Sequence, residues 1–382
     1  MATNAIHAGG KQLHPERAVV TPIYQSSNYL FAGEDYHQLG YIRLSTTPNH
    51  RVLAARIAAL EWTESALVLG SGMAAISGTL LSLLGTGDHL LAQGNLYGGT
   101  ATLLHREFPK WGITHTSIDA QRPDSWAAAV RPATRVVYVE TMTNPLLEVA
   151  DHLEVVEFAK GNGLVSVIDN TFASPVGFRP AEIGYDIVVE SCTKFMSGHS
   201  DIVAGSVAGS GEHVAAIKHT QDHLGGALDP HAAFLLERGL KTLEVRVREQ
   251  TRTAGLLARM LEGHAAVSRV YYTGLESHPQ HSRASQLFHG HGGMLSLELV
   301  GGLEAASRFS AAVEIPTVAV SLGGPESLVI RPAATSHAGL APEEREASGI
   351  TDGLIRFSTG LENADDLLDD IDRALRLSQQ QG

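Results

Sequence analysis

The chain has 382 residues, of which 43% are apolar and 18% are charged, a globular composition with enough length for two domains. Its formal net charge of −13 disfavours nonspecific binding to nucleic acid or to an anionic membrane, although one local arginine can still hold a small anion. The single cysteine cannot form a disulfide within the chain, and we find neither a membrane-spanning apolar stretch nor a basic region followed by an apolar core, so we predict a cytoplasmic protein without a signal peptide.

The first 50 residues predict an extended arm, because they carry little periodicity and many glycine, proline, asparagine and histidine residues. Such an arm is either flexible or packed against another surface, for example a second subunit. Tyr41 and Arg43 lie within it, and taken alone they are typical of an exposed pair. We predict that a large domain over residues 51–235 and a smaller domain over residues 236–382 follow this arm.

A glycine-containing turn joins an expected strand at residues 66–69 to an expected helix that ends near residue 84. The turn Gly70-Ser71-Gly72 would present backbone N–H groups and the positive end of the helix dipole to a bound phosphate. The same letters match the dinucleotide-binding fingerprint, which requires an acid at the end of the next strand. The acid in this chain, Asp88, stands at the start of that strand and not at its end, which disfavours a nicotinamide-dependent dehydrogenase.

Strands and helices alternate over most of the large domain, which predicts an α/β fold with a mostly parallel sheet and helices on both faces. The strands are expected at residues 66–69, 88–92, 135–140, 164–168 and 187–189. Each strand is followed by a candidate functional group: Gly70, Tyr97, Asn144, Asp169 and Lys194. Open α/β folds bind their ligands at the carboxyl ends of the strands, so we expect these groups to share one cleft.

The pattern changes after Pro230, where two long helices are expected at residues 232–240 and 243–261. The remaining elements are strands at residues 293–299, 318–324 and 354–358, a helix at residues 304–313, and a last helix that Asn363 caps. This mixture predicts a smaller α+β domain.

The groups at the strand ends match the needs of pyridoxal phosphate. Lys194 offers an amine that can attack a carbonyl when it is desolvated, and Asp169 offers a fixed anion for a pyridinium nitrogen. Tyr97 offers a flat ring for stacking. The expected phosphate donors are Gly72, Met73, Ser191 and Thr193. In the small domain, Arg356 can pair its guanidinium group with a substrate carboxylate.

Short motifs spread along nearly the whole chain carry a family resemblance. They are Tyr41-Ile42-Arg43, Ser71-Gly72-Met73-Ala74-Ala75, Tyr97-Gly98-Gly99-Thr100, Asn144-Pro145, Asp169-Asn170-Thr171, Ser191-Cys192-Thr193-Lys194, Ser197-Gly198-His199-Ser200-Asp201, Ser321-Leu322-Gly323-Gly324 and Ile355-Arg356-Phe357-Ser358. Together they resemble the Cys/Met-metabolism pyridoxal-phosphate enzymes, which include cystathionine γ-synthase, cystathionine γ- and β-lyases, methionine γ-lyase and O-acetylhomoserine sulfhydrylase. The resemblance implies an aspartate-aminotransferase-like fold of type I and pyridoxal 5′-phosphate as the cofactor.

The family implies a role for each candidate residue. Lys194 would carry the cofactor through an imine and move protons, Asp169 would pair with the pyridine nitrogen, and Tyr97 would stack on the ring and help in proton transfer. The phosphate would be held by Gly72, Met73, Ser191 and Thr193. Tyr41 and Arg43 would reach the phosphate of a neighbouring subunit, which implies a homo-oligomer, usually a dimer of dimers. The substrate's α-carboxylate would be held by Asn144, Ser321 and Arg356.

The resemblance leaves two reactions open. Family members specific for cystathionine commonly carry a glutamate where this chain has Val320, and methionine γ-lyases carry a cysteine where it has Gly99. We predict a lyase that acts by γ-elimination on sulfur amino acids, of the cystathionine γ-lyase or methionine γ-lyase type, and gives 2-oxobutanoate, ammonia and a thiol. The alternative is a γ-replacement transferase that acts on an activated homoserine.

Two other classes of protein compete with this interpretation. The 19 histidines include His219 and His223, one helical turn apart, but no acid or cysteine completes a ligand set, so we predict no metal site. The second class is a non-catalytic relative that keeps the fold only for binding. The presence of Lys194, Asp169 and Arg356 argues against it, because a binding protein would not need these three residues. Cys192 is expected to be buried packing beneath the cofactor rather than a nucleophile, because strand ends flank it.

Overall fold

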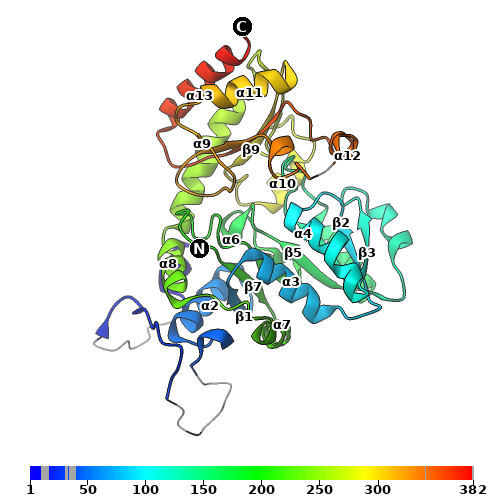
Figure 1. Ribbon diagram of the computed structural model, residues 1–382, viewed down its shortest axis with the longest axis vertical. Helices are drawn as coiled ribbons and strands as arrows, with labels where there is room; N and C mark the ends of the chain where they lie inside the picture. The colour runs from blue at the N-terminus through cyan, green and yellow to red at the C-terminus, as the bar shows by residue number, and fades with distance from the viewer. Residues whose placement is uncertain (10–16, 31–32, 34–39, 340, 381–382) are drawn as a thin grey trace. The chain divides into compact units, whose positions relative to one another are not determined.

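The computed structural model describes residues 1–9, 17–30, 33, 40–339 and 341–380, and its elements are labelled in Figure 1. The chain divides into two compact units. Unit 1 consists of Met1–Gly94, Gly99–Thr141 and Ala150–Glu244, and unit 2 consists of Asn95–Gly98, Met142–Val149 and Val245–Gly382. The division is not a single cut, because two short segments from the first half of the chain belong to unit 2.

Unit 1 is built on a seven-stranded sheet with the order β1-β7-β6-β5-β4-β2-β3. The strands are β1 (Ser65–Leu69), β2 (His89–Gln93), β3 (Thr114–Ile118), β4 (Thr134–Glu140), β5 (Val165–Asp169), β6 (Ile187–Glu190) and β7 (Gly205–Gly209). Only β7 pairs antiparallel with its neighbours, which gives the other six strands one direction. The predicted α/β class and mostly parallel sheet are confirmed.

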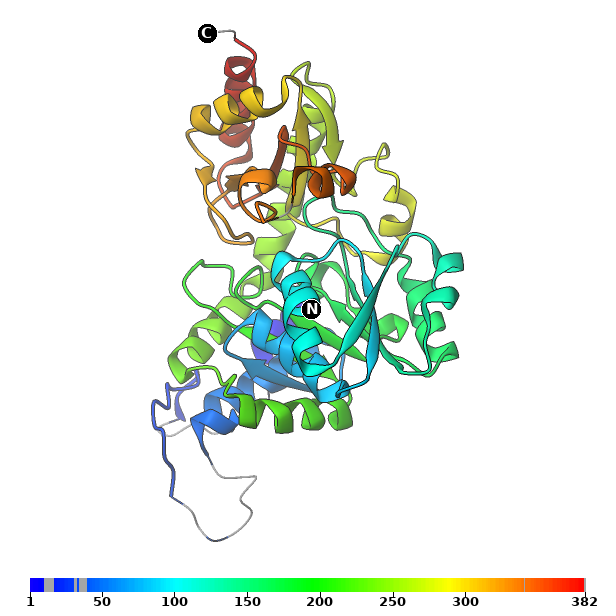
Figure 2. The ribbon, with the colours of Figure 1, turned by 45° about the vertical axis from the view of Figure 1, so that its right-hand side comes forward.

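The helices of unit 1 pack against this sheet and against one another. They are α1 (Ala2–His7), α2 (Pro48–Glu61), α3 (Gly72–Leu83), α4 (Gly98–Thr102, whose first residue belongs to unit 2), α5 (His152–Gly161), α6 (Ser174–Gly177), α7 (Gly211–Leu224) and α8 (Pro230–Leu240). Figures 1 and 2 show α3 and α7 side by side, and α3 also packs on β7. The cap predicted for α5 is present, since the Asp151 carboxylate accepts a hydrogen bond from the amide of Glu154.

The structure of unit 1 differs from the sequence prediction at three places. The start of the chain is not extended throughout, because residues 2–7 form α1, and Arg56 of α2 donates a hydrogen bond to the carbonyl of Ala5 at 2.9 Å. Strand β3 was not expected, since its sequence is polar and it lies at the edge of the sheet. Strand β7 was not expected either, because a glycine stands at each of its ends.

Unit 2 contains a five-stranded sheet with the order β10-β11-β12-β9-β8. The strands are β8 (Val267–Tyr271), β9 (Met294–Leu299), β10 (Thr317–Val318), β11 (Leu328–Ile330) and β12 (Leu354–Ser358). The helices are α9 (Leu243–Glu262, whose first two residues belong to unit 1), α10 (His281–Leu287), α11 (Gly302–Ala312), α12 (Pro342–Ala347) and α13 (Ala364–Ser378). Asn363 caps α13 as predicted, because its side chain accepts hydrogen bonds from the amides of Asp365 and Asp366.

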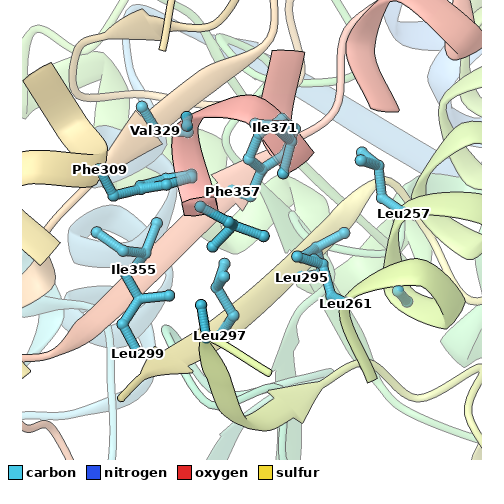
Figure 3. Close-up of a cluster of buried hydrophobic side chains, with 14 of the residues drawn as sticks. Leu257, Leu261, Leu295, Leu297, Leu299, Phe309, Val329, Ile355, Phe357 and Ile371 are labelled. Carbon is cyan, nitrogen blue, oxygen red and sulfur yellow. The ribbon is translucent and has the colours of Figure 1, made fainter. Parts of the chain in front are cut away.

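The hydrophobic core of unit 2 fills the space between one sheet face and helices α9, α11 and α13 (Figure 3). Successive side chains of a strand point to opposite faces, so Ile355 and Phe357 of β12 enter the core together with Leu297 of β9. The polar side chain of Arg356 therefore lies on the other face of the sheet. This alternation positions the candidate substrate site of unit 2.

The strand predicted at residues 318–324 is much shorter in the structure. Strand β10 ends at Val318, and the chain then enters a loop in which Ser321 and Gly323 have φ angles of +91° and +78°. A strand requires negative φ values, so the apolar pattern of this segment belongs to a loop.

We expect Phe309→Ala in α11 to lower the free energy of unfolding by about 3–5 kcal/mol, because Phe309 is fully buried in the core of unit 2. Leu303→Ala is the matched control, since Leu303 lies on the same helix and is 47% exposed. Thermal or urea unfolding of the two variants measures the difference. Equal losses for both variants would contradict the assignment of this core.

Candidate cofactor and substrate sites

The sheet of unit 1 brings the ends of several strands to one edge. Glu190 of β6 lies opposite Ser206 of β7, and Asp169 of β5 lies between Val189 and Glu140. Since β4, β5 and β6 run parallel, their carboxyl ends meet at this edge, as the sequence predicted. Strand β1 ends at the same edge, because Leu69 pairs with the first residue of β7.

The start of α3 packs tightly against the segment that follows β6. Ser71 caps the helix, since its hydroxyl accepts a hydrogen bond from the amide of Ala74 at 3.0 Å. A Cβ atom on Gly72 would lie 2.8 Å from Cβ of Ser191, and one on Gly205 would lie 2.1 Å from the carbonyl oxygen of Ser71. Only glycine fits at both positions, so the backbone approaches closely enough for the first amides of α3 and the Ser191 hydroxyl to serve one ligand.

We call Gly72, Met73, Ser191 and Thr193 the anion cradle. The first amides of a helix have no intrahelical acceptor, which leaves those of Gly72 and Met73 for an anion. The Thr193 hydroxyl also has a structural role, since it donates a hydrogen bond to the carbonyl of Ala204 at 3.1 Å and accepts one from its amide at 3.0 Å. Thr193 thereby fixes the turn that begins after β6.

Lys194 lies in this turn and is partly buried. Its amide donates to the carbonyl of Ser191 at 3.0 Å, and its own carbonyl accepts from the amide of Gly198 at 2.8 Å. The backbone on both sides of Lys194 is thus fixed next to the anion cradle.

Asp169 is buried and hydrogen-bonded at both carboxylate oxygens. Oδ1 accepts from the amide of Thr171 at 3.0 Å and from its hydroxyl at 2.6 Å, and Oδ2 lies 3.4 Å from the Tyr138 hydroxyl. Thr171 Oγ1 also accepts from the amide of Ser191 at 2.8 Å. Thr171 therefore connects the carboxylate to the anion cradle.

Burial raises the pKa of Asp169, and the hydrogen bonds from Thr171 and Tyr138 oppose that rise because they favour the ionised form. Tyr138 is fully buried, and burial, followed by the charges of Asp169 and Glu140, raises the pKa of its hydroxyl well above the usual range. Tyr138 hence stays a neutral hydrogen-bond donor to Asp169. We did not predict Tyr138 or Thr171 as site residues, although a tyrosine within a fully buried strand was a signal for the first.

Two buried carboxyl groups interact in unit 1, and one of them directly precedes the turn that carries Lys194. Glu61 ends α2, Glu190 ends β6, and both side chains are almost inaccessible to solvent. Burial raises the pKa of Glu61 to about 8, and burial together with the charge of Glu61 raises the pKa of Glu190 well above its usual range. Because the charge of Glu61 opposes ionisation of Glu190, the two carboxyl groups do not both ionise at neutral pH, and the pair keeps at least one proton.

Tyr41 precedes a short 3-10 helix on the arm, η3 (Ile42–Leu44), and Arg43 is the middle residue of that helix. The guanidinium of Arg43 lies 5.4 Å from the centre of the Tyr41 ring and donates to the carbonyl of Asp222 on α7 at 2.5 Å. The structure thus joins these residues to each other and to α7, and it shows no hydrogen bond from either of them to the anion cradle within the described chain.

Unit 2 brings Asn144, Ser321 and Arg356 together. Arg356 Nη1 donates to Oδ1 of Asn144 at 3.1 Å, and Nη2 donates to the carbonyl of Ser321 at 2.8 Å. The peptide bond between Asn144 and Pro145 is cis. Tyr97 also belongs to unit 2 and is 46% exposed.

The guanidinium of Arg356 is buried without a counter-ion among the described residues. Burial lowers its pKa to about 10, so the group keeps its charge at neutral pH. Its Nε atom is buried without a hydrogen-bond partner in the described chain. A buried cation is costly unless an anion joins it, so this arrangement is suited to a carboxylate ligand.

Cys192 is fully buried beside Met196 and Ser206, with its Sγ 3.2 Å from the Ser206 hydroxyl. Burial raises the pKa of this thiol far above its usual range. Among the residues that the structure describes, no group of three or more histidine, cysteine or acidic side chains could hold a metal ion. Across the same residues, no helix is long and apolar enough to cross a bilayer.

The family model for Cys/Met metabolism PLP-dependent enzymes matches residues 2–376. The chain belongs to this family. It is 42% identical to L-methionine gamma-lyase of Pseudomonas putida over 388 residues, which cover 99% of this chain and 97% of the relative. The predicted family and its dependence on pyridoxal phosphate are thereby confirmed.

Two solved structures of the family are similar over nearly the whole chain. Cystathionine gamma synthase from Xanthomonas oryzae pv. oryzae, in complex with aminoacrylate and cysteine, gives a TM-score of 0.95 at 38% identity and covers 99% of this chain and 98% of its own. Cystathionine gamma-lyase from Lactobacillus plantarum, complexed with L-serine, gives 0.94 at 36% identity and covers 99% of both chains. These likenesses confirm the predicted fold of type I.

The residues present fit the cofactor of this family. The Gly72 position leaves open the space that a side chain would fill, the anion cradle offers neutral donors to a phosphate, and Asp169 offers a buried carboxylate to a ring nitrogen. Lys194 lies in the same unit and carries an amine of the kind that this cofactor requires.

We expect Glu61→Gln to remove part of the pH dependence of stability. Glu61 keeps its proton up to about pH 8 when the chain is folded but ionises near 4.5 when it is unfolded, so its contribution to stability falls as the pH rises between these values. The variant lacks this titration. Its melting temperature, compared with that of the wild type, should therefore rise by about 4 °C or more between pH 5 and pH 8.

Glu157→Gln is the control for this comparison, since Glu157 is an exposed acid on α5. Its melting temperature should follow that of the wild type at every pH. A Glu61→Gln variant that also follows the wild type would show that the pair holds no extra proton.

Proposed function

We propose that the protein is a pyridoxal-phosphate-dependent lyase that acts by γ-elimination on sulfur amino acids and releases 2-oxobutanoate, ammonia and a thiol. The observation that carries this proposal is the buried Arg356, which has no counter-ion in the described chain and is held by Asn144 and Ser321. An amino-acid carboxylate supplies the missing anion and accepts a bidentate hydrogen bond. The likeness to a protein named L-methionine gamma-lyase supports the reaction type.

Val320 supports an uncharged thioether as the leaving group. It precedes Ser321 in the loop after β10, and its side chain is 64% exposed. A valine at this position offers no acid to a distal ammonium group, whereas its apolar surface suits the methylthio group of methionine. Methionine is therefore our first candidate substrate.

We propose that the anion cradle holds the cofactor's phosphate, that Asp169 pairs with its ring nitrogen, and that Tyr97 stacks on its ring. When bound, pyridoxal phosphate supplies an electron sink that stabilises negative charge at the substrate's Cα. Tyr138 and Thr171 support this site, because their hydrogen bonds hold the Asp169 carboxylate in one orientation.

The proton transfers are assigned to Lys194 and Tyr97. We assign to Lys194 the attachment of the cofactor and the removal of protons from Cα and then from Cβ of the substrate. The loss of the second proton would let the bond between Cγ and sulfur break, and water would then release 2-oxobutanoate and ammonia. Tyr97 is the proposed donor of a proton to the departing sulfur. Arg356 is the proposed partner of the substrate's carboxylate throughout the reaction, and this contact restricts how the substrate can turn.

A homo-oligomer is part of the same proposal. Exposed apolar side chains on the described part of the arm, Val19 at 98% and Leu30 at 101%, support its packing against a second copy. Tyr41 and Arg43 then reach the phosphate of that copy, and two dimers form a tetramer. We further propose that the arm ends near residue 50 and the cofactor domain near residue 235, and that the protein is cytoplasmic, in accord with its single, buried thiol.

A γ-replacement transferase is the second candidate. The likeness to cystathionine gamma synthase, with a TM-score of 0.95, favours it. Such an enzyme would join an activated homoserine to a thiol nucleophile instead of releasing the thiol. The two candidates differ in whether 2-oxobutanoate appears when no nucleophile is added.

We expect the purified holoenzyme to release 2-oxobutanoate from L-methionine or L-cystathionine without an added nucleophile. Lys194→Ala should lower this rate by about a thousandfold or more, because it removes the amine that moves the protons. Lys110→Ala is the control, since Lys110 is a surface lysine paired with Glu107. Chromatography of the keto acid and titration of the thiol measure both products.

Two results would contradict this assignment. If O-acetyl-L-homoserine reacted only when cysteine was present, and the sulfur amino acids gave no keto acid, the protein would be a transferase. Full turnover by Lys194→Ala would remove the proposed role of the lysine.

We expect a mixed dimer of Lys194→Ala and Arg43→Ala chains to be active although both parents are weak. If Arg43 serves the neighbouring subunit, one site of the mixed dimer combines an intact Lys194 with an intact Arg43. Co-expression with two affinity tags isolates the mixed species for assay. A mixed dimer as inactive as its parents would place Arg43 in the site of its own chain.

A further inference from the structure

A row of buried polar side chains lies beside Arg356 in unit 2. Ser358 follows Arg356 by two residues on β12. Ser296 lies directly opposite Arg356 on the neighbouring strand β9. Both serines therefore share the sheet face of Arg356, opposite the apolar face drawn in Figure 3. Ser296 and Ser358 are 0% and 1% exposed, so their hydroxyl groups need partners inside the protein.

Ser296 fixes the segment that carries Asn144. Its hydroxyl donates to the carbonyl of Pro145 at 2.7 Å. Pro145 directly follows Asn144, whose side-chain oxygen accepts from Nη1 of Arg356. The hydroxyl of Ser296 thus sets the position of one of the two groups that orient the guanidinium.

Ser358 and Gln250 fix the segment that carries Ser321. The Ser358 hydroxyl accepts from the amide of Gly323 at 2.9 Å, and the buried Gln250 side chain donates from Nε2 to the carbonyl of Gly324 at 2.8 Å. Ser321 itself has a φ angle of +91°, which a residue with a side chain adopts only when its surroundings impose it. Its carbonyl is the second group that orients the guanidinium, through Nη2 of Arg356.

We propose that Ser296, Ser358 and Gln250 are positioning residues that set the selectivity for substrates with an α-carboxylate. They act through Asn144 and Ser321, which hold the guanidinium of Arg356 from two sides in the geometry that a carboxylate needs. This inference rests on the proposed function, because it assumes that Arg356 binds the carboxylate of an amino acid. Without the three residues Arg356 keeps its charge but loses its fixed direction.

The alternative is that the three residues only stabilise unit 2. Loss of a buried hydrogen bond lowers stability in either case, so unfolding alone does not distinguish them. If the three residues position Arg356, their replacement should weaken the binding only of ligands that carry a carboxylate.

The experiment compares the holoenzymes of the wild type, Ser358→Ala and Ser296→Ala with two probes. L-Methionine carries the carboxylate, and 3-(methylthio)propylamine is the same molecule without it. We expect the KM for methionine to rise about tenfold in each variant with kcat within about twofold. We expect the Kd of the amine, from the change in cofactor absorbance, to stay within about twofold of the wild type.

Two further variants complete the test. Ser358→Thr keeps the acceptor oxygen and should restore the KM, while Ser378→Ala removes a buried hydroxyl that donates only within α13 and should leave both probes unchanged. If Ser358→Ala does not fold, Ser296→Ala tests the same claim from the Asn144 side.

Two results would overturn the positioning role. One is an equal loss of binding for methionine and for the amine, and the other is a KM for methionine that stays within about twofold of the wild type in both serine variants. Failure of the wild type to bind or convert any sulfur amino acid would instead overturn the proposed function, and this inference with it.

Discussion

The cofactor site that we propose in unit 1 depends on a close approach of backbone segments at the edge of the sheet. Strand β7 runs between β1 and β6 in the opposite direction, so its first residue lies among the carboxyl ends of its neighbours. The absence of a side chain at Gly205 lets the turn before α3 cross over it, and the absence of one at Gly72 lets the helix meet Ser191. The helix start and the lysine turn thereby form one surface.

The anion sites that we propose in the two units differ in their charge. Unit 1 offers neutral amide and hydroxyl donors, which cost little when no ligand is bound. Unit 2 buries a charged guanidinium that has no counter-ion in the described chain, and this is unfavourable until an anion arrives. A protein tolerates such a group only when its surroundings hold it, and the hydrogen bonds to Asn144 and Ser321 do so.

Much of the fold could be predicted from the sequence, because strands such as β4, β5 and β6 are continuous apolar segments with polar groups at their ends. Asp169 and Lys194 were predicted as site residues in this way, and the structure places Asp169 at the end of β5 and Lys194 in the turn after β6. The pattern failed where local residues do not reveal the tertiary environment: β3 is polar because it lies at the edge, and the loop of Ser321 is apolar without being a strand. The carboxyl pair of Glu61 and Glu190 was missed for the same reason, since α2 and β6 meet only in the folded chain.

The buried state of Cys192 has a practical and a chemical consequence. A γ-lyase would generate a small thiol next to its own chain, where an accessible cysteine could be captured in a mixed disulfide. The one sulfhydryl of this chain is fully enclosed and stays protonated, so it neither exchanges with such a product nor reacts with aromatic disulfide reagents. In an assay of the native protein, the absorbance that such a reagent produces would therefore measure only the thiol released from the substrate.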